Sequence, residues 1–393
     1  MRRPRFTLLA LLGLLPLASL AANLKITLIA PADDARLERS RLERAYLGHA
    51  GGPAADGVRV ALKEAQLELD AVGTGLTLEV IEADSPAAAQ AAAAKAEKNG
   101  AVALVTDLPA AWTLAVADAV KLPVLNVGNA ENRLREQDCR ARLFHVLPSE
   151  RMRADALAQT LAAARWQQVL LLTGPGPQDA ERSAVAQAAI KRYGLKLVGA
   201  KPFKLSADPR ERDQANLRLL TNPSTAGGAY DVVWVVDSDG EFARTLPYRS
   251  VLPRPVVGDA GLVALAWHAQ FERFGAPQVS RRFGKTVQRP MGAIDWAAWM
   301  AGKALAGAAV ASAKVKGGQA AAFAQALAGT EIDGSKGVPL SFRAWDGQLR
   351  QRLLLTDGQG VVALAPVDGV LHPKNTLDTL GADAPENLCK ARK

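Results

Sequence analysis

The chain has 393 residues, a formal net charge of +9 and only 5% aromatic residues. This length predicts two domains of ordinary size. The positive surplus is small and includes no dense lysine tract, so it does not favour nucleic acid as a partner and suits an anionic small ligand better. Alternatively, the surplus simply keeps an exported protein soluble.

Residues 1–21 have the features of a secretory signal peptide. A basic start, MRRPR, precedes the apolar run FTLLALLGLLPLASL, which is too short for a permanent transmembrane helix, and Ser19-Leu20-Ala21 fits a cleavage site. Cleavage would remove three arginines and lower the charge to +6. No cysteine stands directly after the site, so a lipid anchor has no attachment point, and no later long uncharged apolar run occurs. We therefore expect a periplasmic protein without membrane insertion.

Short apolar runs alternate with alanine-rich helical stretches from Leu24 onward. The runs LKITLIA, LTLEVIEA, AVALVTD and LPVLNVG predict a parallel sheet covered on both faces by helices. The alternation restarts at Leu143 with LFHVLP, QQVLLLTG, LKLVGAKPF and YDVVWVVD, where Ser149 and Asp208 stand at predicted helix N-caps. The predicted fold class is α/β, with two doubly wound βαβ lobes.

The C-terminal third returns to the first pattern with PRPVVGDAG and the long helix GAIDWAAWMAGKALAGAAVASA. It ends in β-rich runs separated by the tight-turn pairs Asp346-Gly347 and Asp357-Gly358. The chain would thus cross between the lobes several times and form a multi-strand hinge beside a ligand cleft. The predicted division is lobe 1 at 22–141 plus 258–330, lobe 2 at 142–257 plus 331–372, and a tail at 373–393.

The two cysteines, Cys139 and Cys389, are far apart in the sequence. In an oxidising compartment an isolated pair is more often bridged than free, so we predict one disulfide, with two unpaired buried thiols as the alternative. By chain entropy, closing so long a loop would contribute roughly 5 kcal/mol. The bridge would pin the tail to the connection between the lobes.

Ligands of open α/β sheets bind beyond the carboxyl ends of the strands, so the candidate binding residues are those that follow each strand. They are Arg36, Arg39, Asp107, Trp112, Asn129, Arg133, Ser149, Arg151, Asp237, Asp259, Trp267 and His268. Three arginines, Arg36, Arg133 and Arg151, follow different strands and would give bidentate bonds to a ligand with several carboxylates. For each arginine alone, an exposed charge is the alternative.

Aromatic and acidic residues refine this hypothesis. The indoles of Trp112 and Trp267 would sandwich a flat ring, whereas Trp166, Trp234, Trp296 and Trp299 are predicted to be core. Asp237 would hold an ammonium group or cap its helix, which argues against a purely anionic ligand. His268 is predicted at the polar rim of the cleft, with a general base or a ligand contact as the alternatives.

The sequence contains no recognisable catalytic or metal motif. Its four histidines lack the spacing of a zinc site, and no GxSxG, HExxH or GxxxxGK(S/T) motif occurs. The segment TGPGPQ lacks the further glycine and acid of a dinucleotide site. We therefore predict a binding protein and not an enzyme, with no metal and no required cofactor.

Several segments together resemble a known family. KITLIAP, the βα units and FRAWDGQLRQRLLL are similar to the type I periplasmic binding proteins of ABC transporters, in the leucine/isoleucine/valine-binding group. A narrower likeness is carried by DCRARLFHVLPSERMRADALAQTLAAARW, AWHAQFERFGAPQ, DWAAWMAGKA and LDTLGADAPENLC. These segments resemble the subfamily associated with pyrroloquinoline quinone (PQQ)-dependent alcohol dehydrogenase systems.

This resemblance implies a monomeric carrier that captures a small ligand by lobe closure and presents it to an inner-membrane permease. PQQ, or another planar aromatic carboxylate, suits both the arginines and the tryptophans and is the predicted ligand. An alcohol, its acid product, or a branched-chain or other amino acid is the alternative. A periplasmic sensor or cofactor-delivery protein that transports nothing is a further alternative.

Overall fold

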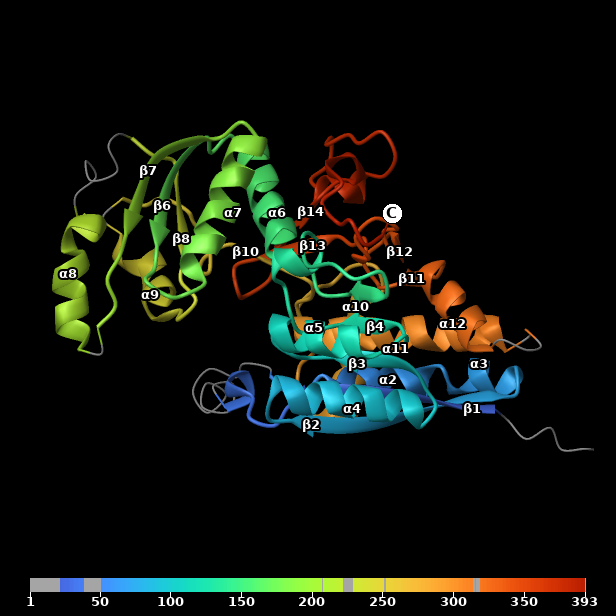
Figure 1. Cartoon of the computed structure of the whole chain (residues 1–393). Coiled ribbons are helices and arrows are strands. Elements are labelled where there is room, and N and C mark those ends of the chain that lie inside the picture. Colours follow the sequence, from blue (N-terminus) through green and yellow to red (C-terminus); the bar gives the residue numbers. More distant parts are fainter. Residues whose placement is uncertain are drawn as a thin grey trace, which may run out of the picture.

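The computed structural model describes residues 22–38, 51–206, 208–221, 229–250, 252–313, 315 and 319–392. The predicted signal peptide and Arg39 lie outside these ranges. Figure 1 shows two lobes, each built on a sheet with helices on both faces, and a group of short strands between them. The predicted α/β class with two parallel-sheet lobes is confirmed.

Lobe 1 contains a five-stranded parallel sheet in the order β2-β1-β3-β4-β5. The strands are β1 (Ala22–Pro31), β2 (Thr74–Ala83), β3 (Ala101–Thr106), β4 (Val124–Asn126) and β5 (Leu143–His145). Neighbouring residues of one strand enter different cores, as Leu104 and Val105 of β3 do. This burial on both faces explains why the strands are nearly continuous apolar runs.

Two groups of helices cover this sheet. One face packs against a group dominated by the contact between α2 and α11, and the other packs against α4 and α5. The helices are α2 (Ala55–Glu64), α3 (Gln66–Ala71), α4 (Pro86–Lys98), α5 (Ala110–Ala119), α10 (Ala276–Val287), α11 (Ala293–Ser312) and α12 (Gln319–Ala328). Small residues along α2 and α11 let the two helices approach closely. A Cβ atom added to Gly302 would lie 2.6 Å from the Cβ atom of Ala61.

Lobe 2 contains a four-stranded parallel sheet in the order β7-β6-β8-β9. Its strands are β6 (Gln168–Thr173), β7 (Lys196–Pro202), β8 (Val232–Val236) and β9 (Val256–Gly258). Its helices are α6 (Glu150–Ala163), α7 (Asp179–Arg192), α8 (Pro209–Thr221) and α9 (Glu241–Arg249). Helices α6 and α7 cover one face, while α9 packs on the other through Phe242, which stacks on Phe203.

Short antiparallel strands follow late in the chain. A three-stranded sheet in the order β10-β13-β14 packs on α6, and a two-stranded ladder, β11-β12, packs beside α11. These strands are β10 (Val263–Leu265), β11 (Glu331–Asp333), β12 (Pro339–Ser341), β13 (Leu353–Thr356) and β14 (Val361–Ala365). Single 3-10 turns are η1 (Asn132–Leu134), η3 (Thr376–Thr379) and η4 (Ala384–Glu386). The predicted antiparallel ending and its Asp357-Gly358 turn are confirmed.

Three segments lie in a different lobe from the one predicted. Strand β5 pairs with β4 and completes the first sheet instead of opening the second. Strand β10 contributes Ala264 to the lobe 2 core, whereas Ile332 and Leu340 of β11 and β12 enter the lobe 1 core. Each of these strands is only three residues long. Their position depends on long-range pairing that local sequence does not encode.

The chain passes between the lobes at three places, which together form the junction: residues 145–149, 264–266 and 347–353. Main-chain bonds join the first and third passages, from His145 N to Gly347 O (2.9 Å) and from Leu349 N to His145 O (2.8 Å). The second passage pairs with the third through β10 and β13. The predicted multi-strand hinge therefore exists as parallel and antiparallel pairing between distant segments.

A buried arginine bonds the connection between β4 and β5 to this junction. Arg135 is 3% exposed and donates to the main-chain oxygens of Asn129, Glu131 and Leu147 and to Gln348 Oε1, all within 3.1 Å. Burial lowers the pKa of Arg135 to about 9, so it remains protonated at neutral pH. Its charge-assisted bonds compensate part of the cost of burying these carbonyls, two of which also accept from Asn126 Nδ2 and Gln348 Nε2.

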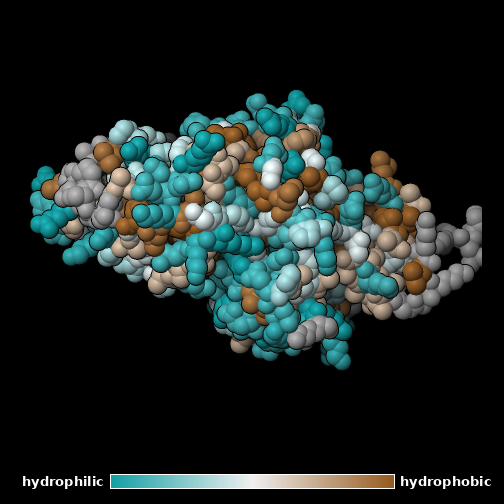
Figure 2. Space-filling view, turned by 90° about the horizontal axis from the view of Figure 1, so that it is seen from above, coloured by the Kyte–Doolittle hydropathy of each residue, from teal (hydrophilic) through white to brown (hydrophobic). Residues whose placement is uncertain are grey.

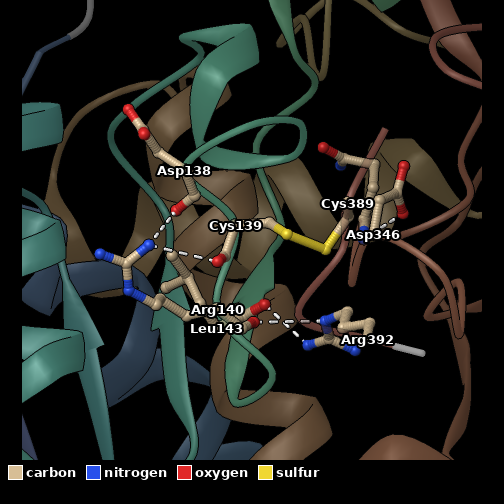
Figure 3. The surroundings of a disulfide bond; sticks show 8 residues. Asp138, Cys139, Arg140, Leu143, Asp346, Cys389 and Arg392 are labelled. Carbon is tan, nitrogen blue, oxygen red and sulfur yellow. Dashed lines mark hydrogen bonds between the residues drawn. A yellow bond between two sulfur atoms is a disulfide. The ribbon is translucent and has the colours of Figure 1, made fainter. Parts of the chain in front are cut away.

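The predicted disulfide between Cys139 and Cys389 is confirmed. It joins the connection between β4 and β5 to the C-terminal tail (Figure 3). No helix in the described ranges is both long and apolar enough to cross a bilayer. On the face shown in Figure 2, hydrophilic residues predominate and hydrophobic residues form separate patches.

Replacing Arg135 should destabilise the fold far more than replacing Arg142, its neighbour in the same connection. Arg135→Met keeps the apolar stem but removes four hydrogen bonds of a buried guanidinium, and we expect a loss of about 2 kcal/mol or more in the free energy of unfolding. Arg142 is exposed and donates to one carbonyl, that of Lys121. Arg142→Met should therefore change stability by less than about 0.5 kcal/mol in urea unfolding. Equal losses in the two variants would contradict this role for Arg135.

Candidate functional site

The second-lobe wall is a cluster of charged residues at the carboxyl edge of the lobe 2 sheet: Glu150, Arg153, Arg182, Asp237 and Asp259. Asp237 and Asp259 follow β8 and β9, while the other three come from the first turns of α6 and α7. All of them except Asp237 line a cavity of about 250 Å³ floored by Val236 and Ala264. The cluster is thus held by rigid elements around a concave surface.

Ion pairs connect the second-lobe wall. Arg182 bonds to Asp259 and lies 3.6 Å from Glu150, and Glu150 also accepts from Arg153 (3.3 Å). Burial raises the pKa of Asp259, although its pairing with Arg182 opposes the rise. Burial would lower the pKa of Arg182, but the two carboxylates outweigh it and raise that pKa above its ordinary value. The wall therefore carries charge that is already compensated internally.

Two atoms of this wall are buried without a hydrogen-bond partner among the described residues: Asp237 Oδ1 and Arg153 Nε. Asp237 is 3% exposed, and its other oxygen accepts from Ala243 N at the start of α9 (2.8 Å). The helix-capping alternative for Asp237 therefore holds for one oxygen only. Buried polar atoms are normally paired, so an orphaned acceptor and donor mark positions where a ligand's groups would be stabilised.

The first-lobe wall consists of Asp34, Arg36 and Asp107, at the carboxyl edge of the lobe 1 sheet. Arg36 Nη2 lies 2.7 Å from Asp34 Oδ2 and 2.8 Å from Asp107 Oδ1. Asp107 is almost fully buried, and burial raises its pKa, whereas Arg36 is 45% exposed. A Cβ at Gly128 would lie 1.7 Å from Asp107 Oδ1. The Asp107 carboxylate therefore requires glycine at position 128, two residues after β4.

Arg133 and Arg151 lie together, but away from both walls. They line a crevice of about 740 Å³ along α7, with Asp155, Arg192 and Glu386. Arg151 pairs with Glu386 (2.6 Å), and Arg133 pairs with Glu131 and Asp138. The prediction that Arg36, Arg133 and Arg151 converge is wrong. Arg133 lies in the 3-10 turn η1, and Arg151 is on the opposite side of α6 from Arg153.

The predicted tryptophan sandwich is also wrong. Trp267 is 1% exposed and stacks on Trp296, with ring centroids 6.1 Å apart, inside the larger lobe 1 core. Trp112 is half-buried against the other core of that lobe, beside α4. The two indoles thus belong to different hydrophobic clusters. The predictions that Trp234, Trp296 and Trp299 are core residues are confirmed, and Trp166 packs partly buried against the lobe 2 core.

The remaining predicted residues have mainly local partners. Ser149 caps α6 by accepting from Met152 N (3.1 Å). Asn129 donates through its main chain to Asn126 Oδ1 (2.9 Å) and accepts from Glu131 N, which shapes the turn after β4. His268 is half-buried, accepts from Gln270 N, and has a pKa lowered by burial. These contacts give each side chain a structural role and leave ligand contact at Asn129 and His268 as a prediction.

Sequence reasoning missed Glu150, Arg153 and Arg182. They stand on helices and not in the loops after strands, where the candidates were sought. Their signal is the acidic and basic spacing in SERMR and DAERS, in which Glu150 and Arg153 are three residues apart on one helix face. No group of three or more potential metal ligands occurs in the part of the chain that the structure describes.

Comparisons with known proteins agree on the fold. Residues 46–213 match the family described as periplasmic binding protein. A branched chain amino acid ABC transporter periplasmic ligand-binding protein from Burkholderia xenovorans is similar with a TM-score of 0.72 and 14% identity, over 94% of this chain and 100% of that one. An ABC transporter substrate-binding protein from Sphaerobacter thermophilus has a TM-score of 0.68 and 16% identity, over 88% and 98%.

A third similar structure is an ABC transporter solute binding protein from R. palustris in complex with benzoate. Its TM-score is 0.61 at 14% identity, covering 90% of this chain and 100% of that one. No curated protein sequence matches this chain. The chain therefore has the type I periplasmic binding protein fold, with two parallel-sheet lobes and a strand junction.

The buried acid of the α7 crevice predicts a pH dependence of stability. Asp155 is 1% exposed, and burial raises its pKa to about 6. Between pH 4 and 6 the unfolded chain would ionise this carboxyl while the folded chain keeps it protonated, so stability falls as pH rises through this window. We expect wild type to lose roughly 2 kcal/mol relative to Asp155→Asn between pH 4 and 7 in urea unfolding. A constant difference would contradict the raised pKa.

Proposed function

We propose that this chain is the periplasmic solute-binding component of an ABC transporter, which captures a small ligand between its lobes and catalyses no reaction. The observation that carries the proposal is the pair of charged walls, one at the carboxyl edge of each sheet, on two lobes that are connected through the junction. The family match over residues 46–213 and the fold of the similar structures support it.

Binding would proceed by closure of the lobes. Each wall alone is shallow and partly exposed, so a ligand gains its second set of contacts only when the walls approach. Such a ligand stabilises the closed state by its differential affinity and shifts an existing equilibrium. An inner-membrane permease would then recognise the closed form. A sensor or delivery protein would use the same closure with a different partner.

The proposed ligand is a small molecule that carries a carboxylate and a hydrogen-bond donor. Arg153 Nε and the guanidinium of Arg182 suit the carboxylate, and the orphaned Asp237 Oδ1 suits a donor such as an ammonium or hydroxyl group. The walls together hold three arginines against five carboxylic acids. This balance favours a zwitterion or a monocarboxylate over a polyanion.

PQQ is therefore a weaker candidate than the sequence alone indicated. Its two supports were converging arginines and a tryptophan sandwich, and neither arrangement exists. PQQ remains a proposal through the resemblance to the subfamily associated with PQQ-dependent alcohol oxidation. Two of the similar proteins are named for branched-chain amino acids and for a benzoate complex. Both ligand types combine a single carboxylate with a compact body.

A binding screen tests the function and the ligand class together. Purified protein would be titrated by calorimetry with leucine, benzoate, a hydroxybenzoate, an alcohol and PQQ, and the bound compound would be recovered and identified. We expect one ligand per chain, recovered unchanged, from the amino acids or aromatic monocarboxylates. Turnover of the compound would contradict the carrier function, while exclusive binding of PQQ would contradict the charge argument.

Substitutions locate the site. Arg182→Gln and Asp237→Asn should each weaken affinity for the ligand found by about tenfold or more, which corresponds to about 1.4 kcal/mol. Arg133→Gln is the matched control, because this arginine is partly buried and ion-paired but lies in the α7 crevice. If only Arg133→Gln weakened binding, the site would lie along α7 and not between the walls.

A further inference from the structure

The C-terminal segment 373–392, here called the strap, crosses the back of the junction and touches both lobes. Figure 1 shows the C-terminal part of the chain, in red, beside α6 and the strands of the junction. Its hydrogen bonds join it to segments that lie more than 200 residues earlier in the sequence. A mere chain end would be expected to fray, because few contacts would hold it in place.

The far end of the strap is anchored to lobe 1. Cys389 is bonded to Cys139 in the connection between β4 and β5. Arg392 donates to the main-chain oxygen of Leu143 in β5 (2.8 Å), and its guanidinium lies 4.7 Å from the centre of the Phe144 ring. Figure 3 shows the disulfide and the Arg392 contacts on neighbouring parts of this connection. This attachment is covalent and therefore cannot slip while the disulfide is intact.

The middle of the strap is bonded to the third passage of the junction. Asp378 is 2% exposed, and its Oδ1 accepts from Arg343 Nε (2.8 Å) and Arg350 Nε (2.9 Å). Arg343 is also buried and donates to the main-chain oxygens of Leu377 and Leu380. Two arginines on one buried carboxylate form a strong attachment, because each bond is charge-assisted in a poorly solvated place.

The strap is also bonded to the helices of lobe 2. Tyr193 at the end of α7 donates to Thr379 O (2.6 Å), and Gln159 of α6 donates to Thr379 Oγ1 (3.1 Å). Gly381 donates to Asp155 Oδ2 (2.8 Å) and accepts from Arg192. A Cβ at Gly381, whose φ is +88°, would meet Met152 of α6 at 2.8 Å. Glycine at this position therefore lets the strap pack closely against α6 of lobe 2.

We propose that the strap is a positioning element that limits how far the lobes rotate, and that Asp378 is its central positioning residue. The lobes must turn relative to each other if the walls are to meet. One end of the strap is covalently fixed to lobe 1, while residues 379–381 are fixed to lobe 2, so rotation must strain or break one attachment. The strap therefore selects the range of lobe separations open to the ligand-free chain.

The experiment measures lobe separation in the ligand-free protein, so it does not depend on the proposed ligand. Spin labels would be attached without cysteine chemistry at two exposed residues, Lys98 at the end of α4 and Lys196 in β7. The label-to-label distance distribution would be compared in wild type, a Cys139→Ser/Cys389→Ser double variant, and Asp378→Asn. We expect a broader distribution in both variants than in wild type.

Asp295→Asn is the matched control. Asp295 and Arg289 also form a buried ion pair, but Asp295 lies within lobe 1, at the start of α11. This variant should lower the melting temperature and leave the distribution unchanged. Should the cysteine variant fail to fold, Asp378→Asn and reduced wild type give the same comparison. Unchanged distributions in folded, strap-disrupted protein would overturn the proposal and leave the strap a stabiliser only.

Discussion

The arrangement depends on satisfying main-chain polar groups where the chain passes between the lobes three times. Passages brought side by side in a dry junction leave carbonyl groups with few partners, and each unpaired group would cost stability. Arg135 and Gln348 add donors there: Gln348 donates to His145 O and Leu147 O while accepting from Arg135, which also donates to Leu147 O. With the junction satisfied in this way, the carboxyl edges of both sheets keep a defined relation to the hinge.

Charged side chains elsewhere in the molecule are also paired within the chain. In each wall, and in the α7 crevice, arginine is held by carboxylates of the chain itself, as Arg36 is by Asp34 and Asp107. A ligand must therefore compete with an existing partner or use the few atoms left unpaired. Such a site would distinguish between ligands mainly by the positions of its unpaired donors and acceptors, because a buried polar group that finds no partner is costly. The net charge of the site would matter less.

Local features of the sequence were enough to predict the α/β class, most strands, the Ser149 cap and the disulfide. These features rest on local periodicity, on capping chemistry and on the redox compartment, all of which the sequence carries directly. The lobe assignment of three-residue strands such as β5 could not be predicted, because pairing with β4 is a long-range choice. Of the candidate site residues, Asp107, Asp237 and Asp259 follow strands as predicted and belong to the two walls proposed here, and their contact with a ligand stays a prediction. The burial of Trp267 and the ion pairs of Arg133 depend on packing, which the sequence does not show.

The arginines in the connection between β4 and β5 show that the number of arginines in a segment is a poor guide to ligand binding. Arg135 donates to main-chain carbonyls of its own connection and to Leu147 O in the junction, Arg133 pairs with its own neighbours, and Arg140 bonds to Asp118 of α5. The connection needs these bonds because it is the covalent attachment point of the strap and has almost no regular structure of its own beyond η1. The ion pairs and hydrogen bonds of these arginines therefore hold the connection where regular secondary structure does not. In the proposed function, ligand recognition falls instead to Arg153 and Arg182, which stand on the first turns of α6 and α7.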